Sequence, residues 1–199
     1  MVKSVSILGS TGSIGRQTLD IVSRMPVKVA ALTAGTSVER MAEQCRQFVP
    51  ELAVMATEEA ANQLKDAIAD LSTRVAWGEE GLMEAAALDG VDCVITAVVG
   101  MVGLKPTLAA IRAGKRIGLA NKETLVCAGE LVMAEAEKYG AEIIPVDSEH
   151  SAIFQCLMGC NDPREIKRLI LTCSGGPFFG MTREQLKKVT KADALKHPN

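Results

Sequence analysis

The sequence predicts an α/β fold with a doubly wound parallel sheet, followed by the start of a second α+β domain. The main observation is that short apolar runs alternate about six times with segments of helical periodicity, which is the pattern of successive β-α-β units. The composition is a second observation, because aromatic residues make up only 3% of the chain. The core must then be built from Ala, Val, Leu, Ile and Met, which suit helices packed closely on a parallel sheet.

The first predicted domain covers residues 1–146. Its seven apolar runs are expected to form strands, at residues 5–8, 27–32, 52–55, 74–77, 93–98, 116–119 and 142–146. The intervening segments are expected to form helices, at residues 14–24, 38–48, 58–71, 81–87, 106–113 and 124–139. Gly114 and Gly140 follow the last two of these helices, where glycine commonly caps a helix C-terminus.

The alternation of strand-like and helix-like segments stops near residue 147, and residues 147–199 are expected to begin a second domain. A helix is predicted over residues 148–158, then a turn, a strand over 166–173, a loop over 174–182 and a helix over 183–189. No closing core element follows before Asn199. We therefore expect these residues to be the truncated beginning of a catalytic or connective domain.

Composition excludes several function classes. The formal net charge is −2 and no basic block occurs, so no nucleic-acid partner is expected. The longest uncharged stretch, residues 93–104, is too short to span a bilayer, so no membrane partner is expected either. Six cysteines without a CxxC pair, and only two histidines, argue against a zinc site and favour small core residues. The expected location is the cytoplasm or a plastid-type organelle interior.

A glycine-rich loop, "ILGSTGSIG" at residues 7–15, joins the first predicted strand to the first helix. Its pattern is GxxGxxG, formed by Gly9, Gly12 and Gly15, rather than the common GxGxxG. Glycines there allow a tight turn and let backbone N–H groups approach a pyrophosphate at the helix N-terminus. A purely structural turn is the alternative, but the strand-loop-helix context favours a dinucleotide site in a Rossmann-like domain.

The end of the second predicted strand indicates which dinucleotide is bound. An acidic residue at this position holds the ribose 2′-hydroxyl of NAD, and none occurs from Thr33 to Ser37. This favours the 2′-phosphate of NADPH, held by the hydroxyls of Thr36 and Ser37, the next helix N-terminus and Arg40. Alternatively, Ser37 only caps that helix, and the two roles are compatible because a cap position is where an anion would dock.

A polar cluster, Asp147, Ser148, Glu149 and His150, follows the last predicted strand. One interpretation is a helix start, because Asp and Ser are good N-caps and acids suit the first turn. The other is a site for a hard cation, Mg²⁺ or Mn²⁺, bound by the carboxylates of Asp147 and Glu149. The cap explains Asp147 but not Glu149, and open α/β sheets place ligands just past the carboxyl ends of their strands.

Five motifs, taken in order, resemble the 1-deoxy-D-xylulose 5-phosphate reductoisomerase family. They are "ILGSTGSIG", "LANKETL" at 119–125, "PVDSEHSAIFQ" at 145–155, "LTCSGGPF" at 171–178 and the terminal "KHPN". The family consists of NADPH- and metal-dependent enzymes of non-mevalonate isoprene biosynthesis. The resemblance implies conversion of 1-deoxy-D-xylulose 5-phosphate to 2-C-methyl-D-erythritol 4-phosphate, by rearrangement of a phosphorylated sugar followed by hydride transfer.

The resemblance also implies roles for individual residues. Expected cofactor contacts are Thr11, Gly12, Ser13, Ile14, Gly35, Thr36, Ser37, Asn121 and Glu123. Expected metal ligands are Asp147 and Glu149. Expected substrate-binding residues are Lys122, Ser148, Glu149, Ser174 and His197, with Lys122 and Glu149 catalytic. One departure is visible: family members often have Lys or Arg and then Asn after the glycine equivalent to Gly35, where this chain has Thr36 and Ser37.

The resemblance further implies a family chain of about twice this length that forms a homodimer. A third metal-binding acid, a loop over the active site and a phosphate-binding pair would lie beyond residue 199. We therefore expect these 199 residues to bind NADPH without catalysing the reaction. The alternatives are an NADP(H)-binding module without catalysis, or another dehydrogenase with a GxxGxxG loop, which the "ANKE" and "VDSEH" stretches together disfavour.

Overall fold

The computed structural model describes residues 2–172 and 176–196. The chain divides into two compact units, Met1–Asp147 and Ser148–Asn199. The first unit contains a seven-stranded sheet in the order β4-β3-β2-β1-β5-β6-β7, with every neighbouring pair parallel. The strands are β1 (Ser4–Leu8), β2 (Lys28–Ala34), β3 (Leu52–Met55), β4 (Arg74–Trp77), β5 (Cys93–Thr96), β6 (Arg116–Leu119) and β7 (Ile143–Pro145). The predicted doubly wound parallel sheet is confirmed.

The chain builds this sheet outward in two directions. It runs from β1 through β2 and β3 to β4, then returns to place β5 on the other side of β1 and continues to β7. The direction of winding therefore reverses between β1 and β5. In open α/β sheets this switch point leaves a crevice at the carboxyl ends of the strands, and ligands bind there.

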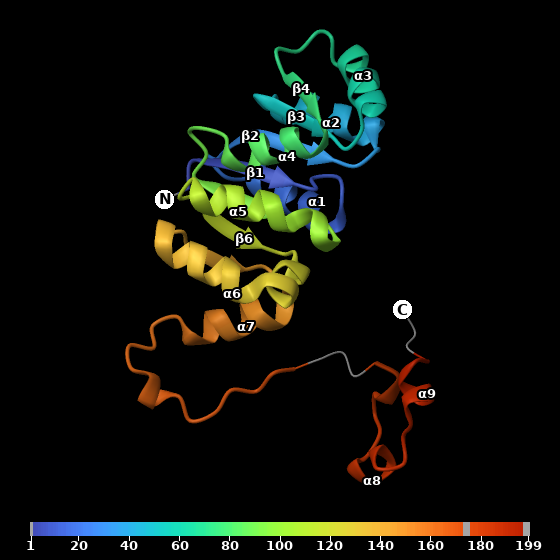
Figure 1. The fold of residues 1–199 in the computed structure, drawn as a ribbon, viewed down its shortest axis with the longest axis vertical. Coiled ribbons are helices and arrows are strands. Elements are labelled where there is room, and N and C mark those ends of the chain that lie inside the picture. Colours follow the sequence, from blue (N-terminus) through green and yellow to red (C-terminus); the bar gives the residue numbers. More distant parts are fainter. Residues whose placement is uncertain (1, 173–175, 197–199) are drawn as a thin grey trace. The chain divides into compact units, whose positions relative to one another are not determined.

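Helices cover both faces of the sheet (Figure 1). They are α1 (Ser13–Val22), α2 (Val38–Phe48), α3 (Glu58–Ala67), α4 (Gly78–Ala87), the 3₁₀ turn η1 (Gly100–Gly103), α5 (Leu104–Arg112) and α6 (Lys122–Tyr139). Residues of α1, α2 and α3 share one core cluster, while residues of α4, α5 and α6 share the other. Ile7 and Leu8 show why one strand serves both clusters, because successive side chains of a strand point to opposite faces.

Local sequence determines several helix ends. Thr57 caps α3 by accepting a hydrogen bond from the Ala60 N–H, and Asn121 caps α6 by accepting one from the Thr124 N–H. Gly140 ends α6 in the left-handed conformation (φ 65°), as its sequence position predicted. Helix α6 also contains one non-helical residue, Ala128, where the helix is kinked.

The cysteine prediction is wrong in part. Of the five cysteines that the structure describes, Cys45 and Cys93 are buried, but Cys127 and Cys156 are exposed and Cys160 is intermediate. Cys127 lies on α6, next to the exposed Val126, so its small apolar side chain is not used in the core.

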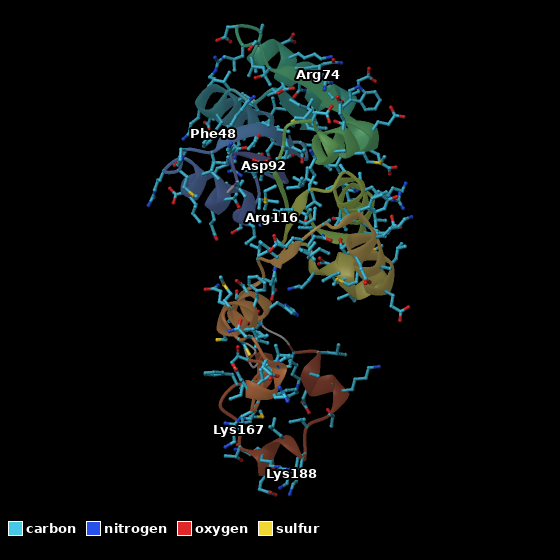
Figure 2. All side chains as sticks on the ribbon, turned by 90° about the vertical axis from the view of Figure 1, so that its left-hand side faces the viewer. Phe48, Arg74, Asp92, Arg116, Lys167 and Lys188 are labelled. Carbon is cyan, nitrogen blue, oxygen red and sulfur yellow. The ribbon has the colours of Figure 1, made fainter. Side chains whose placement is uncertain are left out.

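The second unit contains α7 (Ser148–Leu157), two 3₁₀ turns, η2 (Pro163–Glu165) and η3 (Gly176–Phe178), and two single-turn helices, α8 (Arg183–Leu186) and α9 (Lys191–Ala194). The predicted strand over 166–173 is wrong for its described part, because residues 166–172 form no strand. Lys167, labelled in Figure 2, lies near the start of this segment. A strand needs a neighbour to bind its N–H and C=O groups, and none of the seven strands pairs with this segment.

The predicted helix over 183–189 also ends early, at Leu186. Thr190 begins a separate turn, since its hydroxyl accepts from the Asp193 N–H while the Asp193 side chain accepts from the Thr190 N–H. This reciprocal capping box fixes a helix start at a residue close to where the predicted helix would have ended. In the part of the chain that the structure describes, no helix has the length and hydropathy to cross a membrane.

Candidate functional site

The glycine loop between β1 and α1 has a shape that only glycine allows at two of its three positions. Gly9 has φ +87°, and a Cβ there would lie 2.7 Å from the Ala97 carbonyl oxygen. A Cβ on Gly15 would lie 2.3 Å from the Gly9 carbonyl oxygen. Substitution at either position would therefore force the loop apart, so these glycines are needed for the fold of the loop itself.

Gly12 has a different role, because it is the N-cap of α1 and no side chain caps the helix there. The first-turn N–H groups of a helix lack intrahelical partners and carry a partial positive charge. Gly12 and Ser13 are exposed, while Thr11 and Ile14 are half-buried. The loop thus presents an uncapped helix N-terminus of the kind that binds phosphate groups.

Buried hydrogen bonds hold this loop in place. The Ser10 hydroxyl donates to Gln44 Oε1 at 2.6 Å, and Gln44 Nε2 donates to the Ser10 carbonyl oxygen at 3.0 Å. The Gly9 N–H donates to Thr33 Oγ1 at 2.9 Å, which ties the loop to the end of β2. Sequence reasoning missed Ser10 and Gln44. The available signal was a glutamine on the apolar face of α2, beside Met41 and Cys45.

A cavity of about 630 Å³ opens beside the loop, at the carboxyl ends of β1 to β5. Its volume is within the range of small-molecule sites. Gly9 and Gly35 line it, together with largely apolar residues that include Val54, Leu82 and Leu104. Its position next to both the uncapped helix and the end of β2 is where a dinucleotide would place its adenosine half.

The residues expected near a 2′-phosphate are exposed at the end of β2. Gly35, Thr36 and Ser37 are all accessible. Ser37 is the N-cap residue of α2, as one interpretation expected, but its side chain makes no capping hydrogen bond. The Arg40 guanidinium donates to the Thr11 carbonyl oxygen at 3.3 Å, which fixes a positive charge beside the glycine loop.

Asn121, two residues after β6, is 2% exposed, and both the nitrogen and the oxygen of its side-chain amide make hydrogen bonds within the protein. Its Nδ2 donates to the carbonyl oxygens of Val98 (2.6 Å) and Gly100 (3.0 Å), and its Oδ1 accepts from the Thr124 N–H and hydroxyl. The side chain therefore holds the segment after β5 against the start of α6. Its role toward a cofactor stays a prediction.

Two further expected site residues, Lys122 and Glu123, lie in the first turn of α6. The Lys122 ammonium lies 3.9 Å from Asp147 Oδ2, and Lys122 is 65% exposed whereas Asp147 is only 18% exposed. A lysine at a helix N-terminus is unfavourable toward the macrodipole, and a carboxylate nearby offsets this. Because β6 and β7 are parallel neighbours, their following residues meet at the same edge of the sheet.

The other predicted site residues belong to the second unit. Ser148 and Glu149 form the first turn of α7, with Ser148 exposed and Glu149 half-buried. Ser174 and His197 lie outside the described residues. Within residues 2–172 and 176–196, no three His, Cys, Asp or Glu side chains gather closely enough to hold a metal ion. The metal-binding role of Asp147 and Glu149 therefore stays a prediction.

The parallel sheet, its switch point and the glycine loop define a Rossmann-like α/β protein. The family profile of 1-deoxy-D-xylulose 5-phosphate reductoisomerase matches residues 5–129, and the profile of the C-terminal domain of the same enzyme matches residues 143–199. The chain belongs to the 1-deoxy-D-xylulose 5-phosphate reductoisomerase family.

Individual relatives agree with this assignment over the whole chain. The 1-deoxy-D-xylulose 5-phosphate reductoisomerase of Lachnospira eligens is 54% identical over 199 residues, which is 100% of this chain and 52% of that protein. That of Heliobacterium modesticaldum is 55% identical over 203 residues, 51% of its length. The chain thus spans about half the length of the curated relatives it matches.

Solved structures give the same result. The reductoisomerase from Zymomonas mobilis in complex with NADPH superposes with a TM-score of 0.85 at 43% identity, covering 100% of this chain and 52% of that one. A reductoisomerase in complex with NADPH, fosmidomycin and magnesium superposes with a TM-score of 0.83 at 41% identity, covering 100% of this chain and 52% of that one.

Proposed function

We propose that this chain supplies the NADPH-binding domain, residues 1–146, of an enzyme that converts 1-deoxy-D-xylulose 5-phosphate to 2-C-methyl-D-erythritol 4-phosphate. The observation that carries the proposal is the uncapped N-terminus of α1 beside the 630 Å³ cavity. The helix end suits the pyrophosphate, and the cavity suits the adenosine. The NADPH in the solved Zymomonas mobilis relative supports this choice of cofactor.

The preference for NADPH over NADH rests on the end of β2. The exposed segment from Gly35 to Ser37 contains no carboxylate to accept from a ribose 2′-hydroxyl. The Thr36 and Ser37 hydroxyls and the Arg40 guanidinium are instead donors to a 2′-phosphate. A carboxylate introduced at Ser37 would repel that phosphate and accept from the hydroxyl of NADH.

The residues after β6 and β7 are proposed to meet the substrate and a divalent cation. Asp147 and Glu149 supply carboxylate oxygens, which Mg²⁺ and Mn²⁺ prefer, so the donor chemistry fits. A cation held there polarises the oxygens of the substrate. Lys122 is placed beside Asp147 and supplies an ammonium to substrate oxygen, and Ser148 supplies a hydroxyl.

These 199 residues alone are proposed to bind NADPH without turnover. Within residues 2–172 and 176–196 no group of three His, Cys, Asp or Glu side chains could hold a metal ion, so we expect a cation bound by Asp147 and Glu149 to keep several water ligands. Reacting groups that are loosely positioned lose much of their rate advantage. The second candidate function is an NADP(H)-binding module that takes part in no catalysis. The lack of a three-ligand metal group among the described residues supports this candidate as well.

Titration calorimetry on the 199-residue protein tests the cofactor. We expect NADPH to bind more tightly than NADH, and Ser37→Asp to invert this preference. Equal affinities for the two cofactors would contradict the proposed role of residues 35–37. No binding of either cofactor would contradict the proposed function itself.

Two further measurements test the chemistry. Mn²⁺ should broaden amide NMR signals near Asp147, and Asp147→Asn should abolish the broadening; unchanged broadening in the variant would exclude the site. With 1-deoxy-D-xylulose 5-phosphate and Mn²⁺, the 199 residues should not oxidise NADPH. Turnover near the roughly 10 s⁻¹ typical of enzymes would show that their site is complete.

A further inference from the structure

The cavity has one polar feature on its rim that the proposed cofactor contacts do not use. Lys105 and Glu79 both line it, and Lys105 Nζ lies 2.7 Å from Glu79 Oε1. Glu79 lies in the first turn of α4, after Gly78, and Lys105 is the second residue of α5. The remaining wall is largely apolar, with Val54, Leu82 and Leu104 among its residues.

The location of this pair identifies which half of a dinucleotide it would meet. The residue after β2 contacts the adenosine ribose in this fold, and the cavity extends from there over the end of β3. Val98 and Lys105, which follow β5, also line the cavity, whereas the end of β6 lies beyond β5, where the nicotinamide half would lie. The base that enters the cavity is therefore the adenine.

The chemistry of the pair matches the edge of adenine. Adenine has an amino donor at C6 next to ring-nitrogen acceptors, between two flat apolar faces. The Glu79 carboxylate can accept from the amino group, and the adjacent Lys105 ammonium can donate to a ring nitrogen. The two charges compensate each other, so the pair suits a neutral base better than an anion such as the 2′-phosphate.

We propose that Glu79 and Lys105 are specificity-determining residues that recognise the adenine of the cofactor. This inference rests on the proposed NADPH-binding function. Hypoxanthine has a carbonyl oxygen in place of the amino group, so the Glu79 carboxylate would face an acceptor instead of a donor. The pair would therefore favour NADPH over its hypoxanthine analogue.

The test measures dissociation constants of NADPH, NADH and the hypoxanthine analogue of NADPH by titration calorimetry. Wild-type protein should prefer NADPH to the hypoxanthine analogue by roughly tenfold, the size expected for one hydrogen bond to a charged group. Glu79→Ala should remove most of this preference. Glu84→Ala is the matched control, because Glu84 is on the same helix, pairs with Arg74 and does not line the cavity.

Lys105→Met separates base recognition from phosphate recognition, since it keeps the apolar stem and removes only the ammonium. We expect it to lower the adenine preference severalfold and to leave the ratio of NADPH to NADH affinity unchanged. A fall in that ratio would assign Lys105 to the 2′-phosphate and overturn the proposal. Wild-type protein that binds NADPH without discriminating against hypoxanthine would also overturn it. Absence of NADPH binding would instead refute the proposed function as well.

Discussion

Ser10 and Gln44 are 34 residues apart, yet they are joined by two buried hydrogen bonds. The Ser10 hydroxyl donates to Gln44 Oε1 (2.6 Å), and Gln44 Nε2 donates to the Ser10 carbonyl oxygen (3.0 Å). The pair fastens the glycine loop to α2 on the side of the sheet where α1 packs. The loop is therefore shaped before any ligand binds, and less ordering accompanies the binding of a phosphate.

Removal of the Ser10 hydroxyl is expected to lower both the stability of the fold and the affinity for NADPH. Ser10→Ala leaves Gln44 Oε1 buried without its donor, which should lower the free energy of unfolding by about 1–3 kcal/mol. We expect the NADPH affinity of the folded variant to fall severalfold. Urea denaturation and calorimetry measure the two effects. Ser23→Ala, at the exposed end of α1, is the control and should change neither. Full stability of Ser10→Ala would show that the hydroxyl bond to Gln44 contributes nothing.

Two of the helical glycines, Gly15 and Gly129, are expected to respond in opposite directions to alanine. A Cβ on Gly15 meets the Gly9 carbonyl oxygen at 2.3 Å, so Gly15→Ala should cost about 1–3 kcal/mol or more and disrupt NADPH binding. A Cβ on Gly129 meets nothing within 4 Å, so Gly129→Ala should raise stability by about 0.5–1 kcal/mol. Thermal melts of both variants test this, and destabilisation by Gly129→Ala would contradict it.

Asp92, labelled in Figure 2, is expected to make stability depend on pH. Its Oδ2 accepts from the backbone N–H groups of Lys3 (2.7 Å) and Ser4 (3.0 Å), and these bonds lower the pKa of the carboxyl group, the Lys3 bond most. Because the folded pKa lies below the unfolded value of about 3.9, the contribution is present above that pH and is lost as the pH falls through the folded pKa.

Asp92→Asn tests this dependence. The wild-type protein should melt at a higher temperature than the variant at pH 7, and the difference should shrink as the pH is lowered below about 4. Melting temperatures measured between pH 7 and pH 3 decide the matter. A difference that stays constant across this range would mean that the ionised carboxylate has no special role in the folded state.

The cysteines should differ sharply in reactivity. Burial raises the pKa of the Cys45 thiol to about 11, and burial also raises that of Cys93, so neither should form a reactive thiolate at pH 8. Cys127 and Cys156 are exposed. Iodoacetamide at pH 8 should therefore modify Cys127 and Cys156 in the native protein and reach Cys45 and Cys93 only after unfolding. Peptide mass spectrometry identifies the sites, and rapid native labelling of Cys45 would contradict its burial.

Most of the fold could be predicted because each strand of the sheet coincides with a short apolar run in the sequence. Strands β3, β4 and β6 begin and end at the predicted residues. The strand predicted over 93–98 ends instead at Thr96, since the Val98 carbonyl oxygen is bound by the side chain of Asn121. Such a contact joins residues that are distant in sequence, and no local pattern reveals it.

The site was predictable to a different degree from the fold. The glycine loop and the absence of an acidic residue at the end of β2 can be read directly from neighbouring residues in the sequence. The pairs Ser10–Gln44 and Glu79–Lys105 depend on which helices become neighbours, so periodicity alone could not find them. The segment 166–172 shows the converse, because its apolar residues favour a strand but no other described strand pairs with it.

All seven strands of the sheet come from one uninterrupted stretch, Met1–Asp147. During synthesis the last strand, β7, is therefore made before any residue of the second unit. At roughly 5–20 residues per second, the whole stretch is made in about 7–30 seconds. The sheet can form, and helices can cover its apolar faces, while later residues are still being added. This order of events protects the nascent chain from aggregation through the unpaired edges of its strands.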